Sequence, residues 1–372
     1  METPRSTTTG QLHIDLGALV ENYQRLDHQT LGAEVAAVVK ADAYGLGVAE
    51  VAPALLEAGC RTFYVAEVGE ATTLRAVLDQ HGSDDAKNAE ILVFAGAQPG
   101  TTDELLAQRA TPVLIDPGQV SRWAAAATTQ RRRGALHVDT GISRTGFDQP
   151  GLDWLARKPA ELDRLEIVAV LSHLACADEL DPEPNRQQLA RFVAIRQQFP
   201  QGFGSLANTA GIALGPDYFA EQVRPGIGLY GSDPSPNQTL GLAPVVSLHA
   251  PVVQVRDVNT GEGVGYGATH RMTAPGRLAV LGVGYADGFP RSLSGRGSVV
   301  LHGYRLPIVG RVSMDLTTVD ISNLPEGLVQ PGDHAELIGP TVSIDDVATD
   351  AGTIAYEILT NLGCRYERTY RS

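Results

Sequence analysis

Lysine is rare in this chain, and one of its three lysines stands where an amine could react. The chain has 29 lysines and arginines together, and only Lys40, Lys87 and Lys158 are lysines. Lys40 lies at the end of the apolar segment Val35–Ala41, which reads as a buried strand, and lysine is costly to bury. A desolvated lysine can lose its proton and attack a carbonyl carbon, which arginine cannot do. Lys40 is therefore the candidate for imine chemistry, and an ordinary surface charge is the alternative.

Other polar residues also follow segments that read as strands. They are Asp139, Arg144, His173, Asn208, Thr209 and Arg224. Each of these residues also has an interpretation without a function. A single histidine at a strand end is usually structural, and an arginine before Pro-Gly is usually a solvated turn residue. The repetition of the pattern carries more weight than any one residue.

A phosphate site is the second predicted feature. The loop Pro225–Gly228 alone indicates only a turn. In a barrel of alternating strands and helices, however, the loops after the seventh and eighth strands commonly bind phosphate through backbone N–H groups. Those loops here contain Asn208-Thr209 and Gly226-Ile227. A phosphate site facing a lone strand-end lysine suggests pyridoxal 5′-phosphate (PLP).

The elements that position these residues alternate between strand and helix from about residue 10 to residue 230. Asp15 can cap a first helix, and Asn185–Phe199 reads as a long amphipathic helix. Eight such units predict an α/β fold, a (β/α)8 TIM barrel, in which the chemistry lies at the carboxyl ends of the strands. A doubly wound open sheet is the alternative.

The pattern of predicted strands and helices changes after Gly231. The segment Ser232–Asn237 reads as a linker, and short β-rich runs separated by glycine and proline follow it. One of them predicts a tight hairpin that turns at His302-Gly303. We therefore expect an N-terminal barrel domain over residues 1–236 that binds PLP, and a C-terminal mostly-β domain over residues 237–372.

Composition excludes several classes of function. The 372 residues carry a formal net charge of −14, which argues against nucleic acid or an anionic membrane as a partner. No apolar run is long enough to span a bilayer, and the polar segment Met1–Gly10 lacks the apolar core of a signal peptide. The three cysteines have no metal-type spacing, so we expect no metal, reduced thiols and a cytoplasmic protein.

Several motifs resemble those of one family. The segment VVKADAYGLG, from Val38 to Gly47, resembles the PLP-lysine motif of bacterial alanine racemases. The likeness continues in the family's order over nearly the whole chain. The further matches are HLACAD from His173, ANTAG from Ala207, RPGIGLYG from Arg224, GYG from Gly265, GYADG from Gly284, GRVSMD from Gly310 and YEIL from Tyr356.

The resemblance implies a role for each matching residue. Lys40 would hold PLP as an imine and act as one catalytic base, and Tyr266 of the partner subunit would act as the other. Arg224 would donate to the pyridine nitrogen, and His173 would lie against the ring. The remaining residues implied to bind the cofactor are Tyr44, Asn208, Thr209, Gly226, Ile227 and Tyr356, and those implied to bind substrate are Arg144, Tyr285 and Met314.

The implied function is the interconversion of L-alanine and D-alanine by a homodimer with shared active sites, which would supply D-alanine for peptidoglycan. The alternatives are a non-catalytic PLP-binding homeostasis protein, a barrel-type PLP decarboxylase, and a racemase of serine or broader specificity. The β domain argues against the first. Arg224, in place of an acidic partner for the pyridine nitrogen, argues against the second.

One position departs from the family's pattern. The family often has a carbamylated lysine two residues before the aspartate that is Asp139 here. This chain has His137 at that position, and histidine cannot form the carbamate. We therefore expect Arg144 to be oriented by a neutral side chain or a bound anion rather than by a carboxylate.

Overall fold

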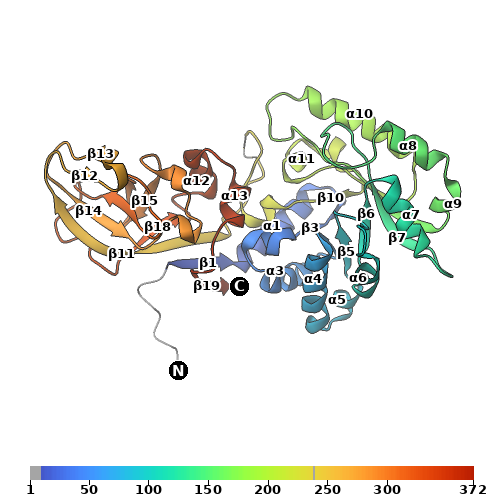
Figure 1. Ribbon diagram of the computed structural model, residues 1–372, viewed down its shortest axis with the longest axis horizontal. Helices are drawn as coiled ribbons and strands as arrows, with labels where there is room; N and C mark the ends of the chain where they lie inside the picture. Colours follow the sequence, from blue (N-terminus) through green and yellow to red (C-terminus); the bar gives the residue numbers. More distant parts are fainter. Residues whose placement is uncertain (1–9, 238) are drawn as a thin grey trace. The chain divides into compact units, whose positions relative to one another are not determined.

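The computed structural model of this protein describes residues 10–237 and 239–372. The chain folds into two compact units (Figure 1). The first, here called the barrel unit, contains Leu19–Leu229 and Asp233–Ala243. The second, the β unit, contains Pro244–Ser372, Tyr230–Ser232 and the segment that ends at Ala18. The predicted polar N-terminus, residues 1–9, lies outside the described residues.

The barrel unit is built on a parallel sheet that closes on itself. Its path among the described residues runs β2-β10-β9-β8-β7-β6-β5-β4-β3. The two ends of this path, β2 (Glu34–Val35) and β3 (Ala37–Val38), are halves of one strand separated by Ala36. β2 pairs with β10 (Gln222–Val223), and β3 pairs with β4 (Thr62–Val65). The other strands are β5 (Glu90–Val93), β6 (Thr111–Leu114), β7 (Arg132–His137), β8 (Leu165–Leu171) and β9 (Phe203–Ser205).

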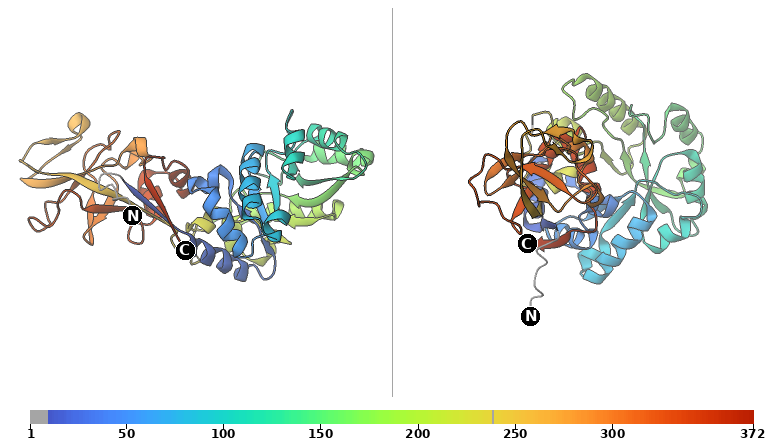
Figure 2. Two further views of the ribbon diagram at one scale, coloured as in Figure 1. Left: turned by 90° about the horizontal axis from the view of Figure 1, so that it is seen from below. Right: turned by 60° about the vertical axis from the view of Figure 1, so that its left-hand side comes forward.

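Helices cover the outside of this sheet (Figure 2). They are α1 (Leu16–Gln29), α3 (Val48–Glu57), α4 (Val68–His81), α5 (Asp84–Asn88), α6 (Thr102–Ala107), α7 (Pro117–Ala125), α8 (Gln149–Ala156), α9 (Pro159–Leu162), α10 (Glu183–Gln198) and α11 (Thr209–Ala213). The predicted (β/α)8 barrel is thus confirmed. Asp15 caps α1 as predicted, because its Oδ1 accepts a hydrogen bond of 2.8 Å from the backbone N–H of Ala18.

The β unit is organised around an eight-stranded sheet with the path β16-β15-β18-β11-β1-β19, to which β14 and β17 are joined through β11. The strands are β1 (Gln11–Asp15), β11 (Val246–Val258), β14 (Gly276–Leu281), β15 (Ser298–Leu301), β16 (Tyr304–Pro307), β17 (Thr317–Asp320), β18 (His334–Ile338) and β19 (Glu367–Arg371). The mostly-β second domain is therefore confirmed. Its first strand, β1, comes from the part of the chain that precedes the barrel.

The predicted hairpin is the pair β15–β16, which is joined by His302 and Gly303. Both turn residues have positive φ, +52° and +82°. Two consecutive left-handed residues are what a two-residue type I′ turn requires, and that turn matches the right-handed twist of the strands. The His302-Gly303 pair therefore marks the turn as the sequence predicts.

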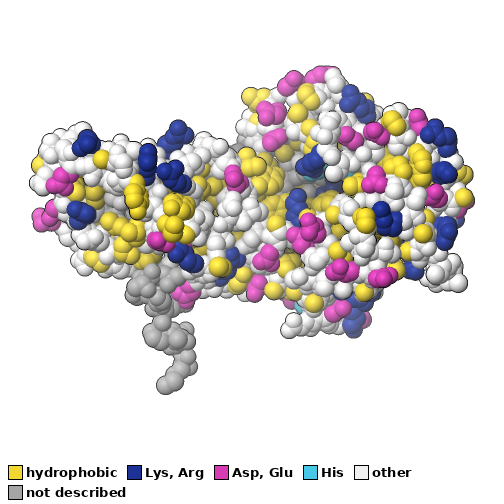
Figure 3. Space-filling view, in the orientation of Figure 1, with side chains coloured by type: hydrophobic (Ala, Val, Ile, Leu, Met, Phe, Trp, Pro, Cys, Tyr) yellow, Lys and Arg dark blue, Asp and Glu magenta, His cyan; other side chains and the backbone are white. Residues whose placement is uncertain are grey.

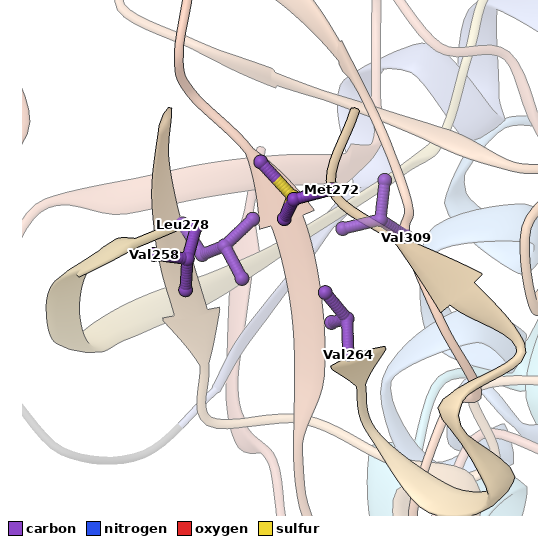
Figure 4. Packing of buried hydrophobic residues seen from close by; sticks show 5 residues of the cluster. All are labelled: Val258, Val264, Met272, Leu278 and Val309. Carbon is purple, nitrogen blue, oxygen red and sulfur yellow. The ribbon is translucent and has the colours of Figure 1, made fainter. Parts of the chain in front are cut away.

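A small apolar core supports one end of the β unit. Val258, Val264, Met272, Leu278 and Val309 are buried together there (Figure 4). Val264 belongs to the short strand β12 (Gly263–Val264), which pairs with β13 (His270–Arg271). The chain between these two short strands carries Tyr266, so the core anchors both sides of the turn that presents this tyrosine.

Charged side chains of both signs are intermixed on the face seen in Figure 3. Within residues 10–237 and 239–372, no helix is long and apolar enough to cross a membrane. The same part of the chain contains no group of three or more His, Cys, Asp and Glu residues placed to hold a metal ion.

Candidate active site

Lys40 lies at the carboxyl end of the strand formed by β2 and β3, where a TIM barrel carries its chemistry. Its Nζ is 5.9 Å from the centroid of the Phe94 ring. Burial, and after it the charge of Arg144, lower the pKa of Lys40 below its ordinary value of 10.5, while Glu70 acts in the opposite direction. The lowered pKa makes the uncharged, nucleophilic form of this amine more accessible.

The chain leaves Lys40 in a left-handed turn. α2 (Lys40–Gly45) contains four consecutive residues with φ between +52° and +58°, from Ala41 to Tyr44. None of them is glycine, and such a conformation costs about 1–2 kcal/mol for each L-residue. Two carboxylates hold the turn: Glu70 accepts from the N–H of Ala41 at 2.7 Å, and Asp42 accepts from the N–H of Val48 at 2.7 Å.

This turn brings Tyr44 against the loop after β10. A Cβ atom built on Gly226 would lie 2.1 Å from Tyr44 Oη, so a larger residue there would displace the Tyr44 hydroxyl. The backbone N–H groups of Gly226 and Gly228 donate to Thr209 Oγ1 at 3.1 and 3.2 Å. Two hydroxyl groups and two backbone N–H groups thus converge from three separate segments, and these are the groups that bind phosphate.

Two more of the residues predicted to bind the cofactor flank this group of hydroxyl and N–H groups, here called the phosphate cradle. Asn208 caps α11, because its Oδ1 accepts from the N–H of Gly211 at 2.8 Å. Ile227 is fully buried directly after Gly226. The structure therefore brings together Tyr44, Asn208, Thr209, Gly226 and Ile227, which the sequence spreads over more than 180 positions.

Arg224 is almost completely buried, with 4% of its surface exposed. Its Nη2 donates to the carbonyl oxygen of Ser172 at 2.5 Å, and its Nη1 donates to Ser205 Oγ. The guanidinium carbon lies 5.9 Å from the centroid of the Tyr64 ring. These contacts fix the plane of a cation that remains protonated in proteins.

His173 follows β8 as predicted. Burial, and then the charges of Arg224 and Arg144, hold the pKa of His173 well below its ordinary value of 6.5. The imidazole is therefore neutral at physiological pH. A neutral ring can still relay a hydrogen bond, because one of its nitrogens donates while the other accepts.

Arg144 lies on a loop whose conformation is stabilised by hydrogen bonds to Asp139. Asp139 Oδ1 accepts from the N–H groups of Gly141, Ile142 and Ser143 at 2.9, 3.0 and 3.2 Å. The base of this loop is closed by Phe147, whose N–H donates to the carbonyl oxygen of His137 at 2.8 Å. In the part of the chain that the structure describes, no carboxylate forms an ion pair with Arg144.

His137 occupies the position that departs from the family's pattern. Burial, followed by the charges of Arg224 and Arg144, lowers the pKa of His137 to about 4. Its Nδ1 lies 3.4 Å from Thr145 Oγ1, one residue beyond Arg144. At neutral pH, the group beside Arg144 is therefore an uncharged imidazole.

The electrostatics of this site favour an anionic ligand. The charge of Arg144 lowers the pKa values of Lys40, His137 and His173, and the charge of Arg224 lowers those of the two histidines. A cofactor with a phosphate and a phenolic oxygen would offset this concentration of positive charge, and the phosphate cradle and the basic amine complete the match. The residues of the barrel unit thus fit PLP.

The remaining predicted residues lie in the β unit. Tyr266 opens the short turn η3 (Tyr266–Ala268) and exposes 72% of its surface, and Met314 exposes 53%. Tyr285 is also exposed. Its loop lies beside Met314, because the N–H of the next residue, Ala286, donates to the Met314 carbonyl oxygen at 2.9 Å. Tyr356 lies on α13 (Ala355–Thr360) and is half-buried. The predicted role of Tyr266 requires a second copy of the chain, and the roles of all four residues stay predictions.

Two supporting residues were not identified from the sequence. Glu70 belongs to the capping box of α4, which the pair Glu67 and Glu70 could have revealed, but its contact with Ala41 spans 29 positions. Gln188 reads as an ordinary residue of an amphipathic helix, and the structure buries it. Both act through long-range contacts that leave no local pattern.

Comparison with known proteins agrees with this geometry. The sequence model of the alanine racemase N-terminal domain matches residues 14–234, and that of the C-terminal domain matches residues 245–370. An alanine racemase of Rhodospirillum rubrum is 46% identical over 97% of this chain and 96% of its own length. A catabolic alanine racemase of Agrobacterium fabrum is also 46% identical, over 97% of this chain and 92% of its own.

A solved structure is similar over almost the entire chain. The crystal structure of alanine racemase from Bartonella henselae, with covalently bound pyridoxal phosphate, is 40% identical to this protein. The match covers 98% of this chain and 99% of that one, with a TM-score of 0.92.

Proposed function

This chain belongs to the alanine racemase family, and from that premise we propose that it interconverts L-alanine and D-alanine with PLP held at Lys40. The observation that carries the proposal is the strand-end amine of Lys40, whose pKa is lowered by burial. Lys40 lies near two arginine cations, Arg144 and Arg224, and the neutral imidazole of His173.

PLP, when bound, acts as an electron sink that stabilises negative charge on the substrate's Cα. The phosphate would be held by Tyr44, Thr209 and the loop from Gly226 to Gly228. Arg224 would face the pyridine nitrogen, and it can only donate a hydrogen bond there, because its guanidinium does not give up its proton. Arg144 would meet the carboxylate of the amino acid.

Racemisation requires that a proton leave one face of Cα and return to the other. We assign the two faces to Lys40 and to Tyr266 of the partner subunit. A positioned base of this kind contributes roughly 10²–10⁴-fold to the rate. Lys40 suits the role because its amine is partly desolvated, and Tyr266 suits it because its side chain is exposed and free to enter a neighbouring site.

A homodimer with shared active sites follows from this assignment. It is supported by the exposure of Tyr266, Met314 and Tyr285, three large side chains on neighbouring loops of the β unit. Arg365 joins two of these loops, since its Nε donates to Asp287 at 2.6 Å and its Nη1 donates to Asp315 at 2.8 Å. A prearranged surface of this kind suits contact with a second copy.

We further propose that the protein acts in the cytoplasm and supplies D-alanine for peptidoglycan. The cytoplasmic assignment is supported by Cys60, Cys176 and Cys364, all of which are free thiols. Disulfides are rare in that reducing compartment.

Borohydride trapping tests the central assignment. The purified protein, saturated with PLP, is reduced with borohydride, digested and mapped by mass spectrometry. We expect a pyridoxyl group on Lys40 and none on Lys87 or Lys158, and we expect the unreduced protein to racemise L-alanine, as followed by circular dichroism. A Lys158→Arg variant serves as the matched control and should label at Lys40 like the wild type. An adduct elsewhere, or none, would refute the proposal.

A further inference from the structure

One face of α10 is polar where an amphipathic helix is expected to bury aliphatic side chains. Asn185, Gln188 and Arg191 recur at intervals of three residues and therefore lie along the same side of the helix. Asn185 is fully buried, and Gln188 is 3% exposed. Burying an amide is costly unless it is hydrogen-bonded, so the partners of this face indicate its purpose.

Gln188 bonds to both loops that carry predicted site residues. Its Nε2 donates to Thr140 Oγ1 at 3.2 Å and to the carbonyl oxygen of His173 at 2.9 Å. Its Oε1 accepts from the N–H of Ala175 at 2.8 Å. Thr140 belongs to the loop of Arg144, and His173 belongs to the next loop around the barrel. One side chain therefore ties together residues 139–146 and residues 172–177.

The direction of every hydrogen bond in this network is determined. Ser172 Oγ donates its single proton to the carbonyl oxygen of Val138 at 2.8 Å. Thr140 Oγ1, which lies 2.7 Å from Ser172 Oγ, must therefore donate to it. The Thr140 oxygen is then free to accept from Gln188. Only an amide at position 188 can donate twice and accept once in this arrangement.

The neighbours of Gln188 on the same face reinforce this tie. Arg191 Nη1 donates to the carbonyl oxygen of Thr140 at 2.9 Å, and Asn185 Nδ2 donates to the carbonyl oxygen of Cys176 at 2.8 Å. Gly141 permits the close approach, because a Cβ atom there would lie 2.9 Å from Arg191 Nη1. The two loops are thus held from outside the barrel by one rigid helix.

We propose that Gln188 is a positioning residue, which sets Arg144 and His173 at a fixed separation by holding their two loops on α10. The inference rests on the proposed function for the roles of Arg144 and His173, but the tie itself is a property of the cofactor-free fold. Misplacing a group at an active site by about 1 Å can cost on the order of 10²-fold in rate. The tie therefore influences catalysis although Gln188 is not assigned a contact with the substrate.

The decisive variant is Gln188→Glu, which keeps the shape of the side chain and replaces its donor by an acceptor. The matched control is Gln187→Glu, because Gln187 is exposed on the same helix and bonds only within it, to Glu183. Thr140→Val, with Thr140→Ser as its conservative counterpart, tests the network from the other end and avoids a buried charge.

The first readout is amide hydrogen exchange of the PLP-free protein. Gln188→Glu and Thr140→Val should accelerate exchange in residues 139–146 and in residues 172–177 together, while α3 and α4 keep their protection. Gln187→Glu and Thr140→Ser should match the wild type. Acceleration in only one loop, or equal acceleration throughout the barrel, would overturn the proposal.

The second readout is steady-state kinetics of the PLP-loaded enzyme. We expect kcat to fall by about tenfold or more in Gln188→Glu and Thr140→Val, with a smaller change in KM, since misplaced groups lose alignment in the transition state. Thr140→Ser should restore kcat. Unchanged kcat with accelerated exchange would overturn the link to catalysis, whereas a wild-type protein that does not racemise alanine would refute the proposed function and leave the exchange result standing.

Discussion

Around Lys40, the site gathers cations and neutral imidazoles rather than paired charges. Arg144 and Arg224 are cationic, and burial and these arginines keep His137 and His173 neutral. Burial and Arg144 lower the pKa of Lys40. The positive charge of Arg144 thus disfavours protonation of all three other groups, and that of Arg224 disfavours protonation of the two histidines. The result is a pocket that can hold an anion strongly and still offer an uncharged amine as a base or nucleophile.

The role of Tyr266 can be tested through proton exchange. In Tyr266→Phe, we expect Lys40 still to exchange the α-deuterium of D-alanine with solvent, whereas the α-deuterium of L-alanine should be retained. Racemisation should fall by roughly 10²–10⁴-fold, equally in both directions, because the equilibrium constant cannot change. Deuterium loss is measured by NMR on each isomer. Tyr304→Phe, at another exposed tyrosine of the β unit, is the control.

If the α-deuterium of both isomers exchanged at equal rates in Tyr266→Phe, one base would serve both faces. The assignment of Tyr266 of the partner subunit as a base would then be wrong.

The histidines of the barrel make stability depend on pH. The pKa of His137 is lowered to about 4 in the fold and is near 6.5 in the unfolded chain. The unfolded chain therefore binds more protons below pH 6.5, so the stability present at pH 7 is lost as the pH falls toward 4. For His137 alone, we expect about 2 kcal/mol to be lost between pH 7 and pH 5.

Urea unfolding of the cofactor-free protein at several pH values between 5 and 7 measures this loss, and most carboxylates stay ionised in that range. The dependence on pH should be shallower in His137→Asn, which removes the titrating group. An identical slope in the variant and the wild type would contradict the assignment of a neutral, buried His137.

At the scale of the element, the left-handed turn α2 is the costly part of the site. Four consecutive L-residues adopt positive φ directly after Lys40. Their strain is offset by the hydrogen bonds that Glu70 and Asp42 accept from backbone N–H groups, and it serves to direct Tyr44 toward Gly226. Strain of this kind concentrates at functional sites, where the surroundings over-determine the conformation.

Ala41 is suited to a test of this strain because the residue is exposed. Valine at this position should destabilise the protein by about 1–2 kcal/mol, since a β-branched side chain tolerates positive φ poorly. Glycine should leave the free energy of unfolding unchanged or raise it by up to about 1 kcal/mol. Chemical denaturation of the three cofactor-free proteins should therefore rank them Gly, Ala, Val from most to least stable, and the reverse order would show that the turn is not strained.

At the scale of the whole molecule, the predicted site residues are divided between two units. Lys40, Arg144, His173 and Arg224 belong to the barrel unit, and Tyr266 and Met314 belong to the β unit. A shared site in a symmetric dimer would give each site a barrel from one subunit and a β unit from the other.

Subunit complementation tests this arrangement. Lys40→Ala and Tyr266→Phe should each be almost inactive alone. After they are mixed, dissociated and reassociated, half of the dimers should be mixed, and each of these should contain one intact site. Activity should then recover to about a quarter of the wild-type value. Absence of recovery, despite mixed dimers demonstrated by mass spectrometry, would show that both residues act within one chain.

Local features of the sequence predicted much of this protein. An apolar run before a rare lysine placed Lys40 at a strand end, Asp15 marked the start of α1, and His302-Gly303 marked a hairpin. Alternation of strand and helix indicated the barrel, and the order of motifs indicated the family. Residue propensities and periodicity over short segments encode these features, so they can be recognised without knowledge of the tertiary structure.

Other features were decided only by the tertiary structure. The pairing of β1 with β11 and β19, the left-handed turn after Lys40, the support of that turn by Glu70 and the joining of two loops by Gln188 could not be predicted. Each depends on contacts between distant segments, and burial together with neighbouring charges moves the pKa values of Lys40, His137 and His173 from their ordinary values. The sequence determined which chemical groups the chain possesses, and the closed barrel determined which of them meet and in what protonation state, because desolvation and charge coupling exist only once the chain has folded.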